Sequence, residues 1–241
     1  MRTVVISQPT YLPWIGYLRV MKEADVFVFL DNVQFEQRSW QCRNRIKSCG
    51  KALWLTVPTH SNLQSRICDV EIDNSKPWRR QHWTAIKTSY GKAPYFTEYS
   101  SFIKSVYTKK WISLVLLNIH LIKYLASTLG LSPVLVQASK LGALEGKRTT
   151  LLLELCKMFN ADRYVSSIGA KEYMENDGAK EIFEKEGISV EFLKFNHVVY
   201  PQLFGTFIPD LSIIDCLFNC GPDSPKIVFD EKATIFQKLD I

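Results

Sequence analysis

Residues 4–31 constrain the fold of this chain more than any other stretch. They read VVISQPTYLPWIGYLRVMKEADVFVFLD, in which a β-rich run at 3–7 is followed by a polar loop, a helical pattern from Trp14 and a second β-rich run at 26–30. Strand, loop, helix and strand within about thirty residues indicate a βαβ unit. Ligands bind such units where the first strand ends and the helix begins, because free backbone N–H groups and the helix dipole meet there.

The rest of the chain continues this alternation. Further strands are expected at 52–57, 134–137, 163–166 and 189–195, and helices at 76–90, 101–107, 110–129 and 147–159, then up to 185 and at 211–220. The pattern predicts an α/β fold with a mainly parallel, Rossmann-like sheet, formed as a single domain over 1–241 with a mostly helical insertion around 75–130. The short apolar run at 3–7 is expected inside the sheet, buried on both faces.

Composition excludes several classes of protein. The chain has 241 residues, 46% of them apolar, and a formal net charge of +6, which suits an anionic small molecule better than nucleic acid. No signal peptide is evident, and the apolar run at 111–122 is too short to span a membrane, so a cytoplasmic location is expected. Six cysteines without a paired C-x-x-C spacing favour reduced thiols, and no metal site is expected.

Several motifs together resemble one family. They are QPTYLPWIGYL, AD-x-x-V-x-x-D-x-VQF, W-x-C-RNRIK and WLTVP in the first quarter, YVSSIGAKEY at 164–173 and YPQLFGTFIPDLSIIDCLFNCG at 200–221. This combination is similar to the WbqC-like family, found in bacterial gene clusters for O-antigen and other surface polysaccharides. The resemblance implies a role in surface-polysaccharide (lipopolysaccharide) assembly. It also marks Asp31, Gln34 and Gln202, which lie inside these motifs, as substrate-binding candidates.

The first loop is rich in side chains that contact ligands. Gln8, Thr10 and Tyr11 are candidates to orient a reacting group. Trp14-Ile15-Gly16-Tyr17 sits where H-x-G-H lies in the nucleotidylyltransferase superfamily, so the loop resembles that superfamily at the level of fold, with both histidines replaced. Trp14, Gly16 and Tyr17 are therefore expected to bind a nucleotide-sized ligand. The alternative is that Trp14 and Tyr17 pack in the core under the helix.

Two further segments offer polar groups. Arg43, Arg45 and Lys47 would point the same way on an extended chain, with Asn44 between them, and could grip a diphosphate; the alternative is a solvated basic loop. Ser166, Ser167, Lys171 and Tyr173 follow a predicted strand and could contact the same ligand, or form a turn capped by Ser167. The segment at 142–150 fails as a P-loop but could bind an anion at a helix start.

Two titratable residues each have two possible roles. His60 could act as a general base near the end of a strand, although a solvated loop histidine is the commoner case. Asp215 lies in an apolar helix, where its carboxylate either pairs with an arginine or faces the site.

These observations predict a transferase that adds an acyl or aminoacyl group to a nucleotide-activated amino sugar. Gln8, Thr10, Tyr11, His60 and Lys171 would be catalytic, and ATP or another nucleotide is the candidate cofactor. A non-catalytic nucleotide-sugar-binding or scaffold protein is the alternative, and a homodimer is compatible with the sequence. A single cleft is expected to gather the first loop, the basic segment and the serines of 166–167, together with most of the positive charge.

Overall fold

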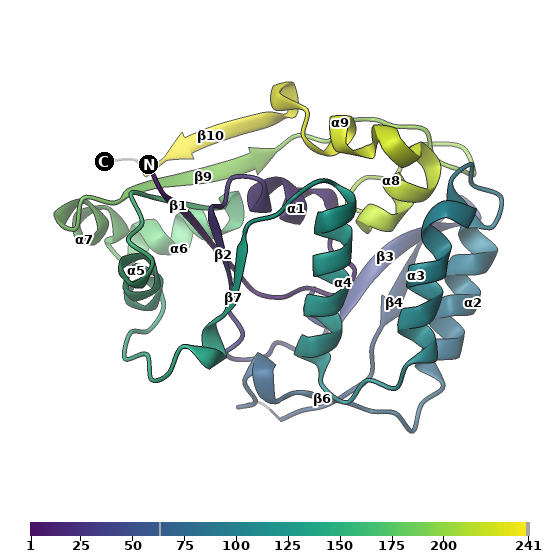
Figure 1. Cartoon of the computed structure of the whole chain (residues 1–241), viewed down its shortest axis with the longest axis horizontal. Coiled ribbons are helices and arrows are strands. Elements are labelled where there is room, and N and C mark those ends of the chain that lie inside the picture. The colour runs from purple at the N-terminus through teal and green to yellow at the C-terminus, as the bar shows by residue number, and fades with distance from the viewer. Residues whose placement is uncertain (63, 240–241) are drawn as a thin grey trace.

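Strand β1 (Thr3–Ser7) lies in the middle of a six-stranded sheet, in a computed structural model that describes residues 1–62 and 64–239. The strand order is β10-β9-β8-β1-β2-β7. All neighbours pair in parallel except β10, which is antiparallel to β9 at one edge (Figure 1). The other bounds are β2 (Val26–Phe29), β7 (Val134–Gln137), β8 (Arg163–Ser167), β9 (Ser189–Phe195) and β10 (Thr234–Lys238). The predicted α/β class with a mainly parallel sheet is confirmed.

The sheet is covered on both faces, as the apolar run of β1 requires. Val5 points into one hydrophobic core together with Phe27 of β2, and Val4 points into the other together with Val28. The first core also holds helices α1 (Ile15–Met21), α4 (Leu114–Thr128) and α8 (Ile213–Cys220). The second holds α5 (Thr149–Met158), α6 (Lys171–Asn176) and α7 (Ala179–Lys185). Because Val4, Val5 and Ile6 are all buried, the predicted interior position of this strand is confirmed.

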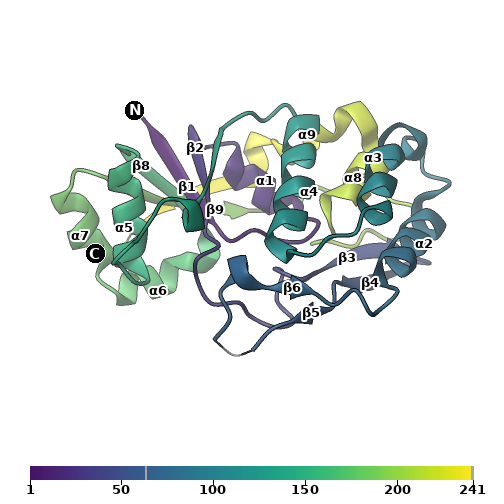
Figure 2. The same cartoon turned by 60° about the horizontal axis from the view of Figure 1, so that its bottom comes forward.

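The segment from 43 to 128 forms a layer beside the sheet (Figure 2). It contains an antiparallel hairpin of β3 (Arg43–Ser48) and β4 (Lys51–Thr56), and then the short pair β5 (Thr59–His60) and β6 (Glu71–Ile72). Helices α2 (Trp78–Tyr90) and α3 (Phe96–Thr108) pack on each other and precede α4. Three helices thus fall within the span where a helical insertion is expected, and the single-domain organisation stays a prediction.

Several elements differ from the sequence-based expectation. The helix expected to run to residue 185 is two helices, because Gly178 adopts a left-handed φ of 67° that interrupts it. Helix α3 begins at Phe96, directly after the break at Pro94. The sequence did not predict strand β10, because its apolar residues do not alternate with polar ones. Ile235 and Phe236 are adjacent, and both are exposed in the structure. The chain also contains helix α9 (Ser224–Val228) and 3-10 turns at Ile67–Asp69, Ala138–Lys140, Ile168–Ala170, Gly221–Asp223 and Glu231–Ala233.

Across residues 1–62 and 64–239, no helix combines the length and the apolar character needed to cross a bilayer.

Asp31, directly after β2, joins the ends of two neighbouring strands. Its carboxylate accepts hydrogen bonds from the Ser139 backbone N–H at 2.8 Å, the Ser139 hydroxyl at 2.7 Å and the Gln137 amide at 2.6 Å. The side chain is fully buried. Both carboxylate oxygens of Asp31 therefore accept hydrogen bonds from within the chain, and the residue has a structural role at the carboxyl ends of β2 and β7.

We expect Asp31→Ala to lower the free energy of unfolding by about 3 kcal/mol, because it leaves buried donors of Gln137 and Ser139 without an acceptor. Urea denaturation measures the change. Asp223→Ala, which removes an exposed carboxylate, is the matched control and should cost less than about 0.5 kcal/mol. A loss for Asp31→Ala as small as that of the control would show that these bonds do not stabilise the sheet.

Candidate functional site

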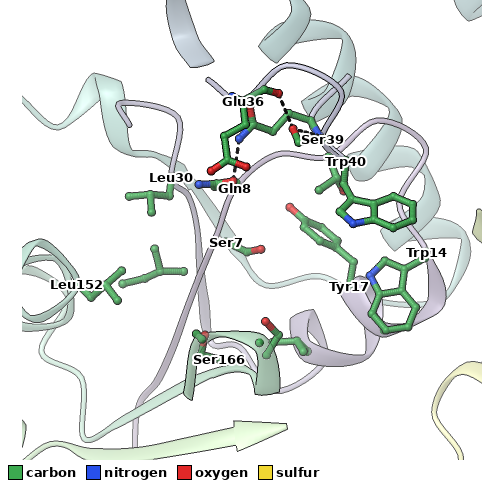
Figure 3. A pocket seen from close by; sticks show the side chains of 18 of the residues that line it. Ser7, Gln8, Trp14, Tyr17, Leu30, Glu36, Ser39, Trp40, Leu152 and Ser166 are labelled. Carbon is green, nitrogen blue, oxygen red and sulfur yellow. Dashed lines mark hydrogen bonds between the residues drawn. The ribbon is translucent and has the colours of Figure 1, made fainter. Parts of the chain in front are cut away.

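A pocket of about 390 Å³ opens at the carboxyl ends of β1 and β8 (Figure 3). The chain leaves β1 through α1 and returns as β2 on one side, while β8 lies on the other side of β1. This is the point at which the strand order reverses, where α/β sheets open a crevice for ligands. The volume is in the range of small-molecule sites.

The pocket is lined by residues from four segments. Those from the first segment are Ile6, Ser7, Gln8, Thr10, Trp14, Gly16, Tyr17 and Val20. The others are Leu30, Glu36, Ser39, Trp40, Gln41, Asn44, Leu152, Tyr164, Ser166, Ser167, Gly169, Ala170 and Tyr173. The segments at 8–17 and 164–173, far apart in the sequence, therefore meet in one pocket.

The first loop is held in place by two buried amides from other elements. Asn44 of β3 donates to the carbonyl oxygens of Leu12 at 2.6 Å and Tyr11 at 3.3 Å. Asn118 of α4 donates to the carbonyl oxygens of Pro9 at 3.2 Å and Gln41 at 2.7 Å. Both amides are almost fully buried, so each satisfies backbone oxygens that water cannot reach. We call Asn44 and Asn118 the amide clamp.

Tyr11 anchors the same loop through its side chain. Its hydroxyl lies 2.8 Å from Nδ1 of His82 and 2.5 Å from the hydroxyl of Tyr107, in a buried cluster behind the pocket. Burial, with smaller contributions from Tyr107, raises the pKa of Tyr11 well above its ordinary value. Tyr11 therefore does not line the pocket, and its role in the structure is to fix the loop.

A relay of amides sets the orientation of Gln8. The backbone N–H of Glu36 donates to Oε1 of Gln41 at 3.0 Å, and Nε2 of Gln41 donates to Oε1 of Gln8 at 2.8 Å. The side chains of Glu36 and Gln8 lie next to one another at the pocket wall (Figure 3). Since the oxygen of Gln8 is occupied, its amide nitrogen is the end left to donate to a ligand.

Trp14 and Gly16 form the start of α1 together. A Cβ atom on Gly16 would lie 2.2 Å from the indole of Trp14, so glycine is required there because the Trp14 ring folds over it. The indole fills the space beside Gly16 and forms part of the pocket wall, close to Tyr17 and Trp40 in Figure 3.

Two hydroxyls of this segment are suited to donate to a ligand. The Oγ1 atom of Thr10 is buried and has no hydrogen-bond partner among the residues that the structure describes. Burial raises the pKa of Tyr17 well above its ordinary value, and the neighbouring Ser7 hydroxyl offsets part of that rise, so the phenol stays neutral. An unpartnered buried hydroxyl in a pocket wall indicates a ligand contact.

The opposite wall comes from the end of β8. Ser166 is buried, Ser167 is exposed, and both line the pocket with Tyr173. Burial raises the pKa of Tyr173 and the nearby Asp177 adds to the rise, while Arg148 opposes it. The Arg148 guanidinium lies 5.9 Å from the Tyr173 ring centre and 3.0 Å from Asp177, so it is neutralised within the chain.

The positive charge is not in the pocket. The lining set given above contains one charged side chain, the carboxylate of Glu36, and no lysine or arginine. The expectation that the excess of positive charge gathers in the cleft is therefore wrong. The hydroxyls, amides and aromatic rings of the wall favour an uncharged polar ligand group, and Glu36 favours a cationic one.

Arg43 and Arg45 lie beside the pocket, on the outer face of the β3–β4 hairpin. The Arg43 guanidinium is 4.3 Å from the ring centre of Trp54, and Arg45 lies 5.6 Å from the same ring. Trp54 packs on Trp40 with ring centres 5.5 Å apart, and Trp40 lines the pocket. Both tryptophans are more than 40% exposed. We call Trp40, Trp54, Arg43 and Arg45 the rim platform.

Five other predicted site residues lie outside the lining. The Lys47 ammonium donates to the carbonyl oxygens of Gly205 and Thr206, and Gln202 bonds to the backbone of Ile208. His60 is largely exposed, 3.5 Å from Asp73. Gln34 is exposed and forms a backbone bridge with Arg66, and Lys171, at the start of α6, is 3.6 Å from Glu175.

The alternatives for two further segments are also resolved by position. Asp215 is buried and accepts a 2.7 Å hydrogen bond from Tyr90, so its partner is a tyrosine rather than an arginine. Burial raises the pKa of Asp215, and the bond from Tyr90 opposes that rise. The 142–150 segment is tied to its own helix, because Glu154 accepts from the backbone N–H of Gly146 at 2.9 Å.

Ser7, Glu36 and Gln41 line the pocket but were not among the expected site residues. Ser7 is the last residue of β1, which is a position that the topology alone could have indicated. Gln41 lies inside the W-x-C-RNRIK motif and Glu36 directly follows VQF, so the family motifs could have indicated both positions. Among the described residues, no group of three or more His, Cys, Asp or Glu side chains is placed to hold a metal ion.

The chain belongs to the WbqC-like protein family, whose model matches residues 8–227. It is 33% identical over 229 residues to a protein of Mycobacterium tuberculosis named Uncharacterized protein Rv1507c, covering 93% of this chain and 96% of that protein. No solved structure matches the chain.

Gly16→Ala should lower the free energy of unfolding by about 1–3 kcal/mol, because the new methyl group displaces the Trp14 indole. In a Trp14→Ala background the same change should be neutral or stabilising, since alanine favours the helix. A double-mutant cycle by urea denaturation measures this coupling. Equal costs in both backgrounds would show that Gly16 is required for another reason.

The buried His82 should make stability depend on pH. Burial lowers the pKa of His82 to about 4 from an ordinary value of 6.5. Between these values the unfolded chain binds a proton that the folded protein does not, so stability falls as the pH drops through this window, by about 3 kcal/mol in total.

Urea denaturation at about pH 7 and pH 4.5 measures the loss. His82→Gln should reduce it, whereas the control His60→Gln, which changes an exposed histidine, should leave it unchanged. The same loss in the parent and in His82→Gln would contradict the assignment.

Proposed function

We propose that the protein is a transferase of bacterial surface-polysaccharide (O-antigen) biosynthesis that adds an acyl or aminoacyl group to a nucleotide-activated amino sugar. Membership of the WbqC-like family supports the pathway. The observation that carries the substrate class is the lining of the pocket, whose hydroxyls and amides suit a sugar and whose single carboxylate, Glu36, suits an amine.

The parts of the ligand are assigned as follows. The sugar lies between Gln8, Thr10 and Ser166, which offer donors and acceptors to its hydroxyls. Its amine faces Glu36, which binds the ammonium form and takes one proton from it to give the nucleophilic amine. The amine nitrogen then forms the C–N bond as the bond from the acyl carbon to the donor's leaving group breaks, and the second proton departs with that leaving group. His60 and Lys171, expected as catalytic residues, lie outside the lining and are not used in this scheme.

The nucleotide is assigned to the rim platform. The pocket wall contains no cation that could bind a diphosphate, whereas Arg43 lies directly outside it. Arg45 lies beside Arg43 but already donates to the Asp210 carbonyl at 3.2 Å and is 3.9 Å from the Asp210 carboxylate, so Arg43 is the main phosphate ligand in this scheme. Trp40 belongs to both the wall and the platform, so one extended ligand can reach from the amine site to the arginines. An exposed indole also offers a surface on which a pyrimidine base stacks.

A binding protein of the same pathway is the second candidate. It is favoured by one observation, which is that the lining contains no histidine, cysteine or lysine that could act as a nucleophile or carry an acyl group. Turnover separates the two candidates. Product formation from a panel of UDP- and dTDP-amino sugars with acyl donors, lost in Glu36→Gln, would exclude the binding protein.

Ligand-dependent melting tests the substrate class. UDP- or dTDP-amino sugars at 100 times their Kd should stabilise the protein by about 2.7 kcal/mol. Glu36→Gln should reduce the preference for an amino sugar over the corresponding hydroxyl sugar about tenfold, because the charged partner of the amine is lost. The absence of a shift with every nucleotide and nucleotide sugar would contradict the proposal.

Arg43→Ala should weaken binding of the same nucleotide sugars by about 1.5–3 kcal/mol while leaving the melting temperature of the unliganded protein unchanged. Isothermal titration calorimetry measures the difference. Lys226→Ala, which removes an exposed cation from α9, is the control and should bind as the parent does. If Arg43→Ala binds nucleotide sugars with the affinity of the parent, the rim platform does not bind the nucleotide.

A further inference from the structure

The positive charge of the chain is concentrated in one region that the proposed function does not use. Between residues 76 and 123 there are nine lysines and arginines and one acidic residue, Glu98. The whole chain carries a net charge of +6, so the remainder has slightly more acidic than basic residues. This region corresponds to helices α2, α3 and α4.

Most of this charge lies at one end of the three helices. A groove there is lined by Lys76, Arg79 and Arg80 from the start of α2 and by Lys104 and Thr108 from the end of α3. The Arg79 guanidinium donates to the Thr108 carbonyl at 3.2 Å, which joins the two helix ends. In Figure 1 these ends lie together with the start of α4, at the bottom of the view.

The loop between α3 and α4 extends the same surface. Lys109 and Lys110 follow Thr108 directly and are exposed, and the Lys109 ammonium lies 4.2 Å from the ring centre of Trp111. The Asn74 amide donates to the Trp111 carbonyl at 2.7 Å, and so ties this loop to the segment before α2. Six cations are therefore gathered at one end: Lys76, Arg79, Arg80, Lys104, Lys109 and Lys110.

Two large apolar side chains protrude beside these cations. Ile112 is 63% exposed and Leu116, one helical turn later in α4, is 49% exposed. Two carboxylates lie near this surface, and the six cations outnumber them. Asp73 accepts hydrogen bonds from the Ser75 hydroxyl and N–H, and the exposed Glu71 of β6 forms a backbone bridge with Ser113. We call the six cations with Ile112 and Leu116 the basic end.

We propose that the basic end docks the protein on the surface of an anionic lipid bilayer. Clustered lysines and arginines are attracted to anionic headgroups, and exposed aliphatic side chains beside them enter the boundary with the acyl chains. The α3–α4 loop joins the two features: it carries Lys109, Lys110 and Ile112, and its Trp111 carbonyl accepts from Asn74, which lines the groove. Nucleic acid would use the cations but gains nothing from Ile112 and Leu116, and the tryptophan that lines the groove, Trp83, is only partly exposed for base stacking.

Sedimentation with lipid vesicles tests the proposal. The full chain should bind vesicles of phosphatidylcholine with about one third phosphatidylglycerol and should not bind phosphatidylcholine alone. Binding should fall at least tenfold between about 0.1 M and about 0.5 M salt, because the attraction is screened.

Variants separate the two features of the surface. Lys109→Glu with Lys110→Glu should weaken vesicle binding more than tenfold. Ile112→Ser with Leu116→Ser, which leaves the charge unchanged, should weaken it about tenfold. Lys185→Glu with Lys232→Glu changes two exposed lysines elsewhere by the same charge and should bind as the parent does. Melting curves of all variants confirm that they are folded.

The proposal is overturned if the parent fails to bind anionic vesicles, or if the control pair weakens binding as much as Lys109→Glu with Lys110→Glu. It is also overturned if the serine pair binds vesicles as the parent does while a DNA fragment competes fully. That pattern would assign the basic end to nucleic acid. None of these variants touches the pocket or the rim platform, so the outcome is separate from that of the nucleotide-sugar experiments.

Discussion

The structure depends on the hydrogen bonds by which Asn44 and Asn118 hold the loop after β1. That loop is buried, contains two prolines, and passes through a left-handed φ of 45° at Leu12, a conformation that costs a residue other than glycine about 1–3 kcal/mol. Its Pro13 carbonyl oxygen accepts from the Ile213 N–H of α8 at 2.8 Å, whereas the oxygens of Pro9, Tyr11 and Leu12 accept from side-chain amides. The Asn44 amide, 2.6 Å from the Leu12 oxygen, and the Asn118 amide, 3.2 Å from the Pro9 oxygen, stabilise this path. Because these amides come from β3 and α4, the layer outside the sheet determines the shape of the pocket inside it.

The consequence is a preorganised wall. Gln41, whose carbonyl oxygen accepts from Asn118, also orients Gln8 through its side chain, and Asn44 itself lines the pocket. A ligand that enters between β1 and β8 therefore meets donors whose positions are already fixed, which reduces the conformational entropy that binding costs. The same hairpin that supplies Asn44 carries Arg43 and Arg45 on its other face, and so couples the pocket to the rim platform.

Much of this arrangement could be predicted from the sequence, because local patterns determine it. The apolar run at 3–7 and its βαβ context predicted a buried inner strand, and the topology rule predicted that the segments at 8–17 and 164–173 meet.

The roles of individual polar residues could not be predicted in the same way. Tyr11 and Asp31 resemble ligand contacts in the sequence, yet their partners, His82 and Ser139, lie 71 and 108 residues away. The basic segment is a strand whose alternation was recognised, but only the fold shows that Lys47 is buried against backbone carbonyls while Arg43 lies at the rim. Glu36 directly follows the VQF motif, but a carboxylate in a polar segment is ordinarily solvated, so its place in the pocket wall is visible only in the fold.

Hydrogen exchange measured by mass spectrometry on Asn44→Ala tests the central claim, that the amide clamp fixes the first loop. We expect faster exchange in peptides covering residues 9–18, including the Tyr11 N–H that bonds to the Trp40 carbonyl at 2.9 Å. Exchange in helix α7 should stay at the level of the parent, because α7 packs in the second core, on the other face of the sheet. Unchanged exchange at 9–18, or a uniform increase over the whole chain, would contradict the claim.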